Sequence, residues 1–295
     1  MSATIQDPYY SRIEGPAESA ERLDPVVWGS DEGPLSREEL DRYERDGFLL
    51  YPGLVPPGRV ALLWEEAQRL AELYREREEE GMIVEPGSDV VRSVFSIHAN
   101  SELFAGLVAS EELAGRARQL LGSGVYIHHA RVNFKPGFVG KEFYWHSDFE
   151  TWHMEDGMPR MRAVSAVVML TGNNEWNGPL MLIPGSHHTY FRCPGRTPEN
   201  HHTTSLRKQE YGVPTHGQLR EMVEKHGIRS ATGPAGTVLF FECNVMHGSS
   251  GNITPYPRNG VFLAFNSMEN RLVEPFAGIP PRPAFLAERN PVPVG

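Results

Sequence analysis

The chain has 295 residues, of which 40% are hydrophobic, and its formal net charge is −10 at pH 7. This acidic balance argues against nucleic acid and anionic membranes as partners, because both bind basic surfaces. The longest apolar run, residues 164–170, has only the length of a strand, so we expect no membrane span. The start of the chain lacks a leader pattern, which predicts a cytoplasmic location. The two cysteines, Cys193 and Cys243, lie far apart and should be free thiols.

Helical patterns dominate the first part of the chain after an irregular start. Residues 1–35 are rich in Pro, Gly, Asp and Glu without periodicity, which predicts a loosely ordered segment. Ser36 and Glu39 have the spacing of a capping box and indicate the start of a helix. Apolar residues at three- and four-residue intervals, with Gly122 as a stop signal, indicate further helices. The helices that we predict cover residues 36–43, 57–80, 110–121 and, later in the chain, 217–226.

Beyond Gly122 the pattern changes to short apolar runs separated by Gly, Pro and Asn turns, which is typical of strands. We predict strands over residues 48–51, 125–134, 162–171, 180–183, 237–242 and 261–266. Helices followed by many short strands indicate a mainly β protein, a sandwich or jelly roll with flanking helices. We expect a single domain over residues 36–295.

A His-x-Asp pair, His146 and Asp148, points to a metal site. Alternate residues of an extended backbone leave the same face, so both side chains can bind one metal ion. His247 follows the apolar run TVLFFE and is available as a third ligand about a hundred residues later. Two histidines and one carboxylate with open positions are the arrangement of non-haem Fe(II) oxygenases. His153 and Glu155 have a similar spacing without such support, and we interpret that pair as incidental.

Two further patterns suggest an anion site. Arg258 lies eleven residues beyond His247, at the start of a predicted strand, where its guanidinium fork could bind the distal carboxylate of a keto acid. Strand parity places His129, Arg131 and Asn133 on one face of the strand over 125–134, and Lys135 continues that face. Such a polar face either meets water or lines a polar cavity. Parity places the remaining side chains on the opposite face, namely Tyr126, His128, Ala130, Val132 and Phe134.

Trp152 has two interpretations. It can be an aromatic residue of the core or of a lid. Alternatively, it can provide a platform for a flat cationic ligand, because tryptophan has the strongest cation–π face.

The segments HSDFETWHMEDGMP, NGPLMLIPGSHH and NITPYPRNGVF resemble the ectoine hydroxylases of the phytanoyl-CoA dioxygenase superfamily. The resemblance covers nearly the whole chain. It implies a double-stranded β-helix (a cupin-like jelly roll) and Fe(II), with 2-oxoglutarate and O2 as co-substrates and ectoine as substrate. The iron ligands implied are His146, Asp148 and His247. The implied 2-oxoglutarate contacts are Lys135, Arg258, Asn133, Phe143 and Ser165, and the implied substrate contacts are His129, Trp152 and Phe262.

Two positions differ from the family pattern. Position 129 carries histidine in place of glutamine, and position 260 carries glycine in place of the usual asparagine. By parity both should face the pocket, and Gly260 should enlarge it. Because of these differences, an alternative is that the enzyme hydroxylates another small zwitterion, such as a cyclic amino acid, by the same chemistry. A second alternative is a metal-binding jelly roll without catalysis. The expected partners are the small zwitterionic substrate and a second copy of the chain in a homodimer.

Overall fold

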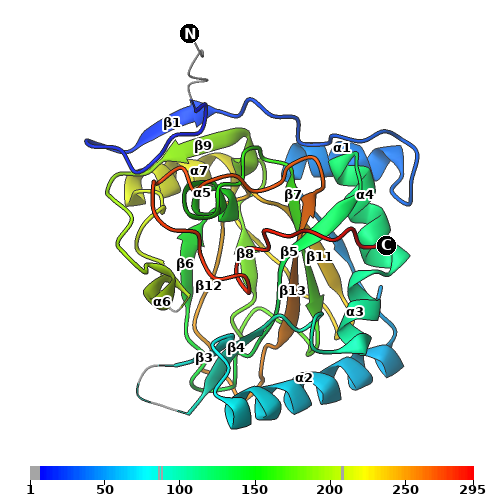
Figure 1. Cartoon of the computed structure of the whole chain (residues 1–295). Helices are drawn as coiled ribbons and strands as arrows, with labels where there is room; N and C mark the ends of the chain where they lie inside the picture. The colour runs from blue at the N-terminus through cyan, green and yellow to red at the C-terminus, as the bar shows by residue number, and fades with distance from the viewer. Residues whose placement is uncertain (1–6, 86, 88, 207–208) are drawn as a thin grey trace.

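Two antiparallel sheets face each other, and helices cover the outer face of the larger one (Figure 1). The computed structural model describes residues 7–85, 87, 89–206 and 209–295. In these residues the large sheet has the strand order β2-β11-β7-β13-β5-β4-β3, and the small sheet has the order β10-β8-β12-β6. This arrangement confirms the jelly-roll core with flanking helices.

The strands have the following bounds. The large sheet contains β2 (Phe48–Tyr51), β3 (Met82–Val84), β4 (Val91–Phe95), β5 (Val125–Asn133), β7 (Ala163–Met169), β11 (Val238–Glu242) and β13 (Gly260–Ser267). The small sheet contains β6 (Phe143–His146), β8 (Leu180–Leu182), β10 (Arg229–Ser230) and β12 (His247–Ser249). A separate pair joins β1 (Glu18–Glu21) to β9 (Thr189–Arg192).

The four predicted helices are present with ends within a few residues of the expected ones. The helices that precede β5 in the chain are α1 (Arg37–Asp46), α2 (Pro57–Arg77), α3 (Glu102–Val108), the π-helical η1 (Glu111–Gly115) and α4 (Arg116–Leu121). Later come α5 (Asp148–Thr151), the π-helical η2 (Trp152–Asp156), the 3-10 turn η3 (Ser186–His188), α6 (His202–Ser205) and α7 (His216–His226). Of these, α3, α5 and α6 were not predicted. The capping box of Ser36 and Glu39 is present, and Gly122 ends α4 in the left-handed region at φ 60°.

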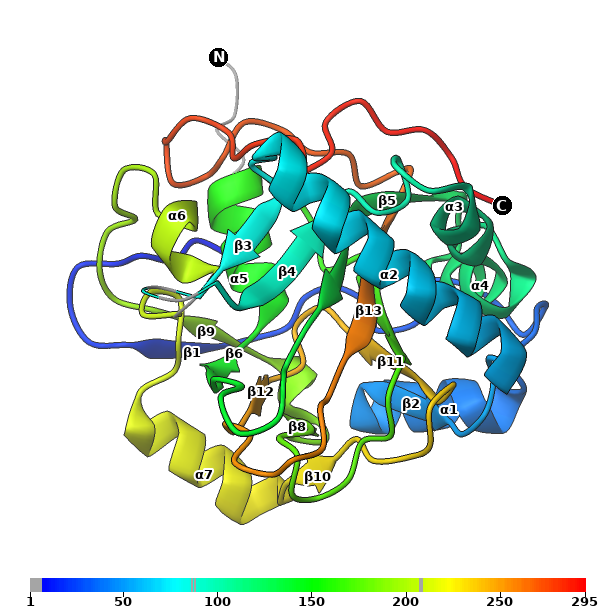
Figure 2. The same ribbon diagram turned by 90° about the horizontal axis from the view of Figure 1, so that it is seen from below.

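The main core lies between the large sheet and α1 to α4; Figure 2 shows α2 crossing that sheet. Strand β7 is buried on both faces. Its Val164, Ala166 and Val168 belong to the core under the helices, whereas Val167 and Met169 pack between the two sheets. This double burial explains why the strand reads as a continuous apolar run.

Strand β5 departs from simple alternation, because it contains a β-bulge. Its register with β13 pairs Ala264 with His129 but Phe265 with Ile127, so His128 is the extra residue. Before the bulge, Val125 and Ile127 pack in the helix-side core, as Ala130 and Val132 do after it. The parity that put Tyr126 and His128 on that face is therefore wrong, since it assumed an uninterrupted strand.

Residues 7–35 of the N-terminal segment pack against the rest of the protein. The prediction of a loosely ordered segment is therefore wrong for these residues. Strand β1 pairs with β9, and Tyr9 is buried. Arg12 forms a buried ion pair with Glu150 (Nε–Oε1 2.8 Å), and Arg22 forms one with Glu242 (Nη1–Oε1 2.9 Å). The composition looked irregular because buried ionic contacts replace the apolar periodicity. Residues 1–6 lie outside the described residues.

Two smaller expectations have clear outcomes. Cys193 and Cys243 are both free and buried, as predicted. Among the described residues, no helix combines the length and the apolar character that crossing a bilayer requires.

Candidate active site

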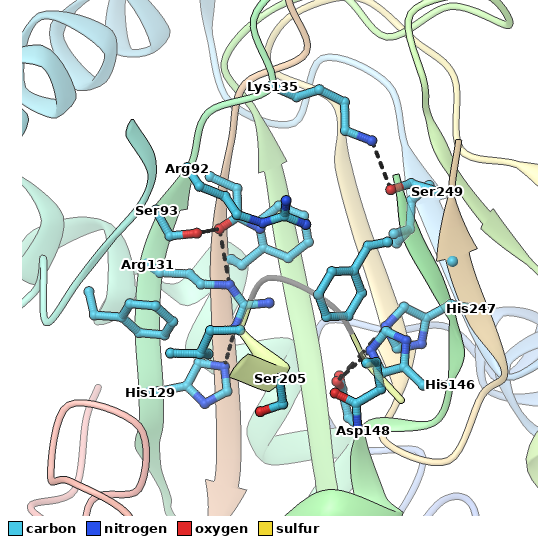
Figure 3. A pocket seen from close by; sticks show the side chains of 18 of the residues that line it. Arg92, Ser93, His129, Arg131, Lys135, His146, Asp148, Ser205, His247 and Ser249 are labelled. Carbon is cyan, nitrogen blue, oxygen red and sulfur yellow. Dashed lines mark hydrogen bonds and ion pairs between the residues drawn. The ribbon is translucent and has the colours of Figure 1, made fainter. Parts of the chain in front are cut away.

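The three predicted metal ligands come together at two neighbouring strands of the small sheet and the helix that follows one of them (Figure 3). His146 ends β6, Asp148 begins α5, and His247 begins β12, where it pairs in register with His146. One ligand atom from each residue lies within 4.8 Å of the others, and in the described part of the chain no other cluster of this kind occurs. The sheet thus brings side chains a hundred positions apart to one point.

Backbone contacts set both imidazoles in the form that binds a metal. Nδ1 of His146 donates to the carbonyl of Tyr144 (2.8 Å), and Nδ1 of His247 donates to that of Val245 (2.9 Å). A carbonyl only accepts, so each Nδ1 carries a proton and each Nε2 is the atom left to bind a metal. The Nε2 atoms lie 3.6 and 3.9 Å from Oδ1 of Asp148. Two imidazole nitrogens and one carboxylate oxygen are a donor set that fits Fe(II).

The charges of this cluster also suit a metal. Burial alone would raise the pKa of Asp148, but His247 and then His146 lower it overall. Burial and the neighbouring His146 lower the pKa of His247 to about 4. At neutral pH the carboxylate is therefore ionised and this imidazole is neutral, which are the states that bind metals. Ser165 donates to Oδ2 of Asp148 at 3.4 Å and supports the carboxylate from behind.

A cavity of about 130 Å³ opens beside the triad, between the two sheets. Its wall contains most of the predicted site residues, namely His129, Asn133, Lys135, Phe143, Trp152, Arg258 and Phe262. Ser165 does not line it. Gly260 is not among the lining residues, but it pairs with the lining residue Asn133, and a β-carbon on it would stand 3.6 Å from the Phe262 ring of the cavity wall. That Gly260 enlarges the cavity stays a prediction.

Lys135 and Arg258 form a cationic pair at one end of the cavity. Nζ of Lys135 donates to Oγ of Ser249 (2.8 Å), and Nε of Arg258 donates to the carbonyl of Gly178 (2.9 Å). In the described residues neither cation forms an ion pair with a carboxylate. Burial, followed by Arg258 and Arg92, lowers the pKa of Lys135 to about 6. An anion bound here would restore the charged ammonium, so the pair favours an anionic ligand.

Arg131 is a further, half-buried cation that the sequence analysis placed on the correct face but did not assign to the site. Its guanidinium lies over the rings of Phe95 (5.5 Å) and Phe262 (5.2 Å). It donates to Oδ1 of Asn133 (3.1 Å) and to Nε2 of His129 (2.8 Å). Burial lowers its pKa to about 10, which leaves it charged at neutral pH. Arg131 and His129 face the triad across the cavity (Figure 3). The signal that could have identified Arg131 was its parity with Asn133.

His153 and Glu155 stay outside the metal cluster, as predicted. Nε2 of His153 contacts the carboxylate of Asp7 (3.1 Å), and Glu155 pairs with Arg12 and His201. These contacts are structural, because they join the N-terminal segment and the loop around α6 to η2.

A jelly roll that brings two histidines and an aspartate together beside buried cations is the site of a non-haem, Fe(II)- and 2-oxoglutarate-dependent oxygenase. Residues 43–260 match the model of the family described as phytanoyl-CoA dioxygenase (PhyH), and the chain belongs to this family.

Similar proteins cover almost the full chain. An ectoine dioxygenase from Stutzerimonas stutzeri is 53% identical over 286 residues, which is 96% of this chain and 95% of that protein. One from Streptomyces avermitilis is 50% identical over 294 residues, or 99% of both chains. The crystal structure of EctD from S. alaskensis with 2-oxoglutarate and 5-hydroxyectoine has a TM-score of 0.87 and 47% identity, covering 96% of this chain and 95% of that chain. Another crystal structure of EctD, with bound Fe, has the same TM-score.

Proposed function

We propose that this protein hydroxylates ectoine to 5-hydroxyectoine, with 2-oxoglutarate and O2 consumed and succinate and CO2 released. The observation that carries the proposal is the presence, around one triad, of two cationic groups that form no ion pair with a carboxylate in the described residues, unlike Arg92 and Arg282. Lys135 with Arg258 forms the first, and Arg131 forms the second. A dianionic co-substrate and a carboxylated substrate need one such group each. The similarity to ectoine dioxygenases at about 50% identity supports ectoine as the substrate.

His146, Asp148 and His247 would hold the iron. Bound Fe(II) supplies the oxidising chemistry that couples decarboxylation of the keto acid to hydroxylation of a C–H bond. The chain's own share is to orient the three ligands through Tyr144, Val245 and Ser165 and to keep the reacting groups away from bulk water.

Lys135 and Arg258 would bind the distal carboxylate of 2-oxoglutarate. Both are buried, so their charges act with little screening by solvent. Phe143 packs edge-on against His146, with ring centroids 4.9 Å apart, and would form the apolar wall beside the carbon chain. Asn133 also lines the cavity, and its Oδ1 accepts hydrogen bonds from Ser93 and Arg131.

Arg131 would bind the carboxylate of ectoine, and Trp152 would lie against its flat cationic amidine ring. Cation–π attraction strengthens when the partners are desolvated, and the Trp152 side chain is buried in the cavity wall. His129 and Phe262 would complete the substrate wall on either side of Arg131. A zwitterion therefore meets a cation at one end and an aromatic face at the other.

An assay of the iron-loaded protein tests this function. We expect ectoine, 2-oxoglutarate and O2 to give succinate and a product 16 mass units heavier than ectoine, as one added oxygen atom requires. Arg131→Met should raise the KM for ectoine by about 30-fold or more, because truncating one partner of a buried charge pair costs about 2–5 kcal/mol. Its KM for 2-oxoglutarate should change much less.

Proline and pipecolate serve as competing substrates in the same assay. Hydroxylation of either one, with ectoine untouched, would assign the site to the alternative zwitterion that His129 keeps open. Absence of any 2-oxoglutarate turnover in the iron-loaded protein would instead favour the non-catalytic binding protein.

We further propose a homodimer that acts in the cytoplasm, where 2-oxoglutarate is available as an intracellular metabolite. The candidate contact is an apolar patch on three loops, with the exposed side chains Phe138, Val139, Trp176, Ile253 and Tyr256. The loops are joined, since the amide of Phe138 donates to the carbonyl of Thr254 and the side-chain amide of Asn177 donates to the carbonyl of Pro257. A two-fold axis would bury the same patch on both copies. Light scattering should give a dimer mass that Ile253→Asp halves; a monomeric wild type would refute the proposal.

A further inference from the structure

The bulge in β5 turns two neighbouring rings toward the same aromatic residue. His128 and His129 both contact Trp152 edge-on, with ring centroids 5.1 and 5.6 Å away and interplanar angles of 63° and 79°. In a regular strand these two side chains would lie on opposite faces. No hydrogen bond to the Trp152 indole occurs within the described residues, so packing sets its orientation, through these two rings and the buried cluster that contains Phe149 and Met158.

His128 is itself held by a buried ionic pair. Its Nε2 donates to Oδ2 of Asp156 at 3.0 Å. Asp156 also forms a bidentate ion pair with Arg282, with Nε–Oδ1 at 2.6 Å and Nη2–Oδ2 at 2.7 Å. Both His128 and Asp156 are fully buried. Charged hydrogen bonds in such surroundings are strong and geometrically specific.

The partners of this cluster come from three distant parts of the chain. His128 lies on β5, Asp156 ends the η2 segment that Trp152 begins, and Arg282 belongs to the C-terminal segment. Arg282 also lines the cavity. A displacement of any member would therefore move the ring that forms the cavity wall.

We propose that His128, Asp156 and Arg282 are positioning residues that fix the orientation of the Trp152 ring and, through it, the placement of the substrate. The second half of this inference rests on the proposed function, in which Trp152 contacts ectoine. The first half concerns the protein alone.

The chain provides a matched control on the same helical segment. Glu150 also forms a buried two-pronged pair with an arginine, Arg12, at 2.8 and 3.0 Å. This pair faces the N-terminal segment, where Ser11 also donates to Glu150. Glu150→Gln and Asp156→Asn therefore make the same chemical change in similar surroundings, but only Asp156 is bonded to His128.

The test follows the five tryptophans by fluorine NMR. The full chain is labelled with 5-fluorotryptophan and loaded with Zn²⁺ as a diamagnetic substitute for iron, and Trp152→Phe assigns the Trp152 resonance. We expect His128→Phe and Asp156→Asn to shift or broaden this resonance and to leave the others in place. Glu150→Gln should leave the Trp152 resonance unchanged, even if it lowers the melting temperature as much as Asp156→Asn does.

Kinetics then test the consequence for the substrate. In the iron-loaded enzyme, Asp156→Asn should raise the KM for ectoine about 10-fold, a change of about 1.4 kcal/mol, and lower the product formed per 2-oxoglutarate consumed. The KM for 2-oxoglutarate should stay the same. An unchanged Trp152 resonance in folded His128→Phe, or equal changes in Glu150→Gln, would overturn the proposal. Absence of ectoine turnover in the wild type would refute only the proposed function, because the NMR result does not depend on the substrate.

Discussion

Asp148→Ala is expected to abolish hydroxylation. The carboxylate is the one anionic ligand type in the triad, and its loss leaves only two imidazole nitrogens to hold a divalent cation. Removing an outer partner of a metal ligand already costs about 10- to 100-fold in metal affinity or activity, so removing the ligand itself should cost more than about 100-fold. Product mass and iron content after gel filtration measure the two effects. His146→Ala should behave in the same way.

Asp7 provides the control for this experiment. Its carboxylate contacts a histidine, His153, outside the metal cluster. Asp7→Ala should therefore keep its iron and most of its activity. The triad assignment fails if Asp148→Ala still hydroxylates the substrate in an assay with controlled metal content.

Arg258→Met should be the second most damaging change, through the co-substrate. The variant leaves Lys135 as the remaining cation of the pair, and the distal carboxylate loses its guanidinium fork. A truncated buried charge pair costs about 2–5 kcal/mol, which corresponds to at least about a 30-fold rise in the KM for 2-oxoglutarate. Titration of 2-oxoglutarate under anaerobic conditions measures the loss directly.

Arg258→Lys separates charge from geometry. Lysine keeps the charge but cannot make two parallel hydrogen bonds, so we expect an intermediate KM for 2-oxoglutarate. The KM for ectoine should hardly change in either variant. If Arg258→Met binds 2-oxoglutarate as tightly as the wild type, the cationic pair has another role.

The sequence predicted those features whose causes are local. The capping box of Ser36 and Glu39 fixed the start of α1, and the apolar runs located β7 and β11. The metal ligands were also predictable, because the spacing of His146 and Asp148 and the strand before His247 are visible in the sequence. The family resemblance added the residues around the cavity.

Features that depend on long-range contacts could not be predicted in this way. Strand β12 consists of His247, Gly248 and Ser249, which carry little strand preference and are held by their neighbours β6 and β8. The bulge at His128 exists because β5 must match β13, and no residue within β5 marks it. The buried pair of Arg12 and Glu150 joins positions 138 residues apart, so the composition of the N-terminal segment alone suggested looseness.

The pairing of His247 with His146 across two short strands has a consequence for the maturation of the protein. A nascent chain on the ribosome that has not yet reached residue 247 lacks one of the two imidazoles. Even a completed chain brings them together only when the small sheet closes. Coordination by both imidazoles therefore requires a closed small sheet, and iron held there would stabilise the folded protein by mass action.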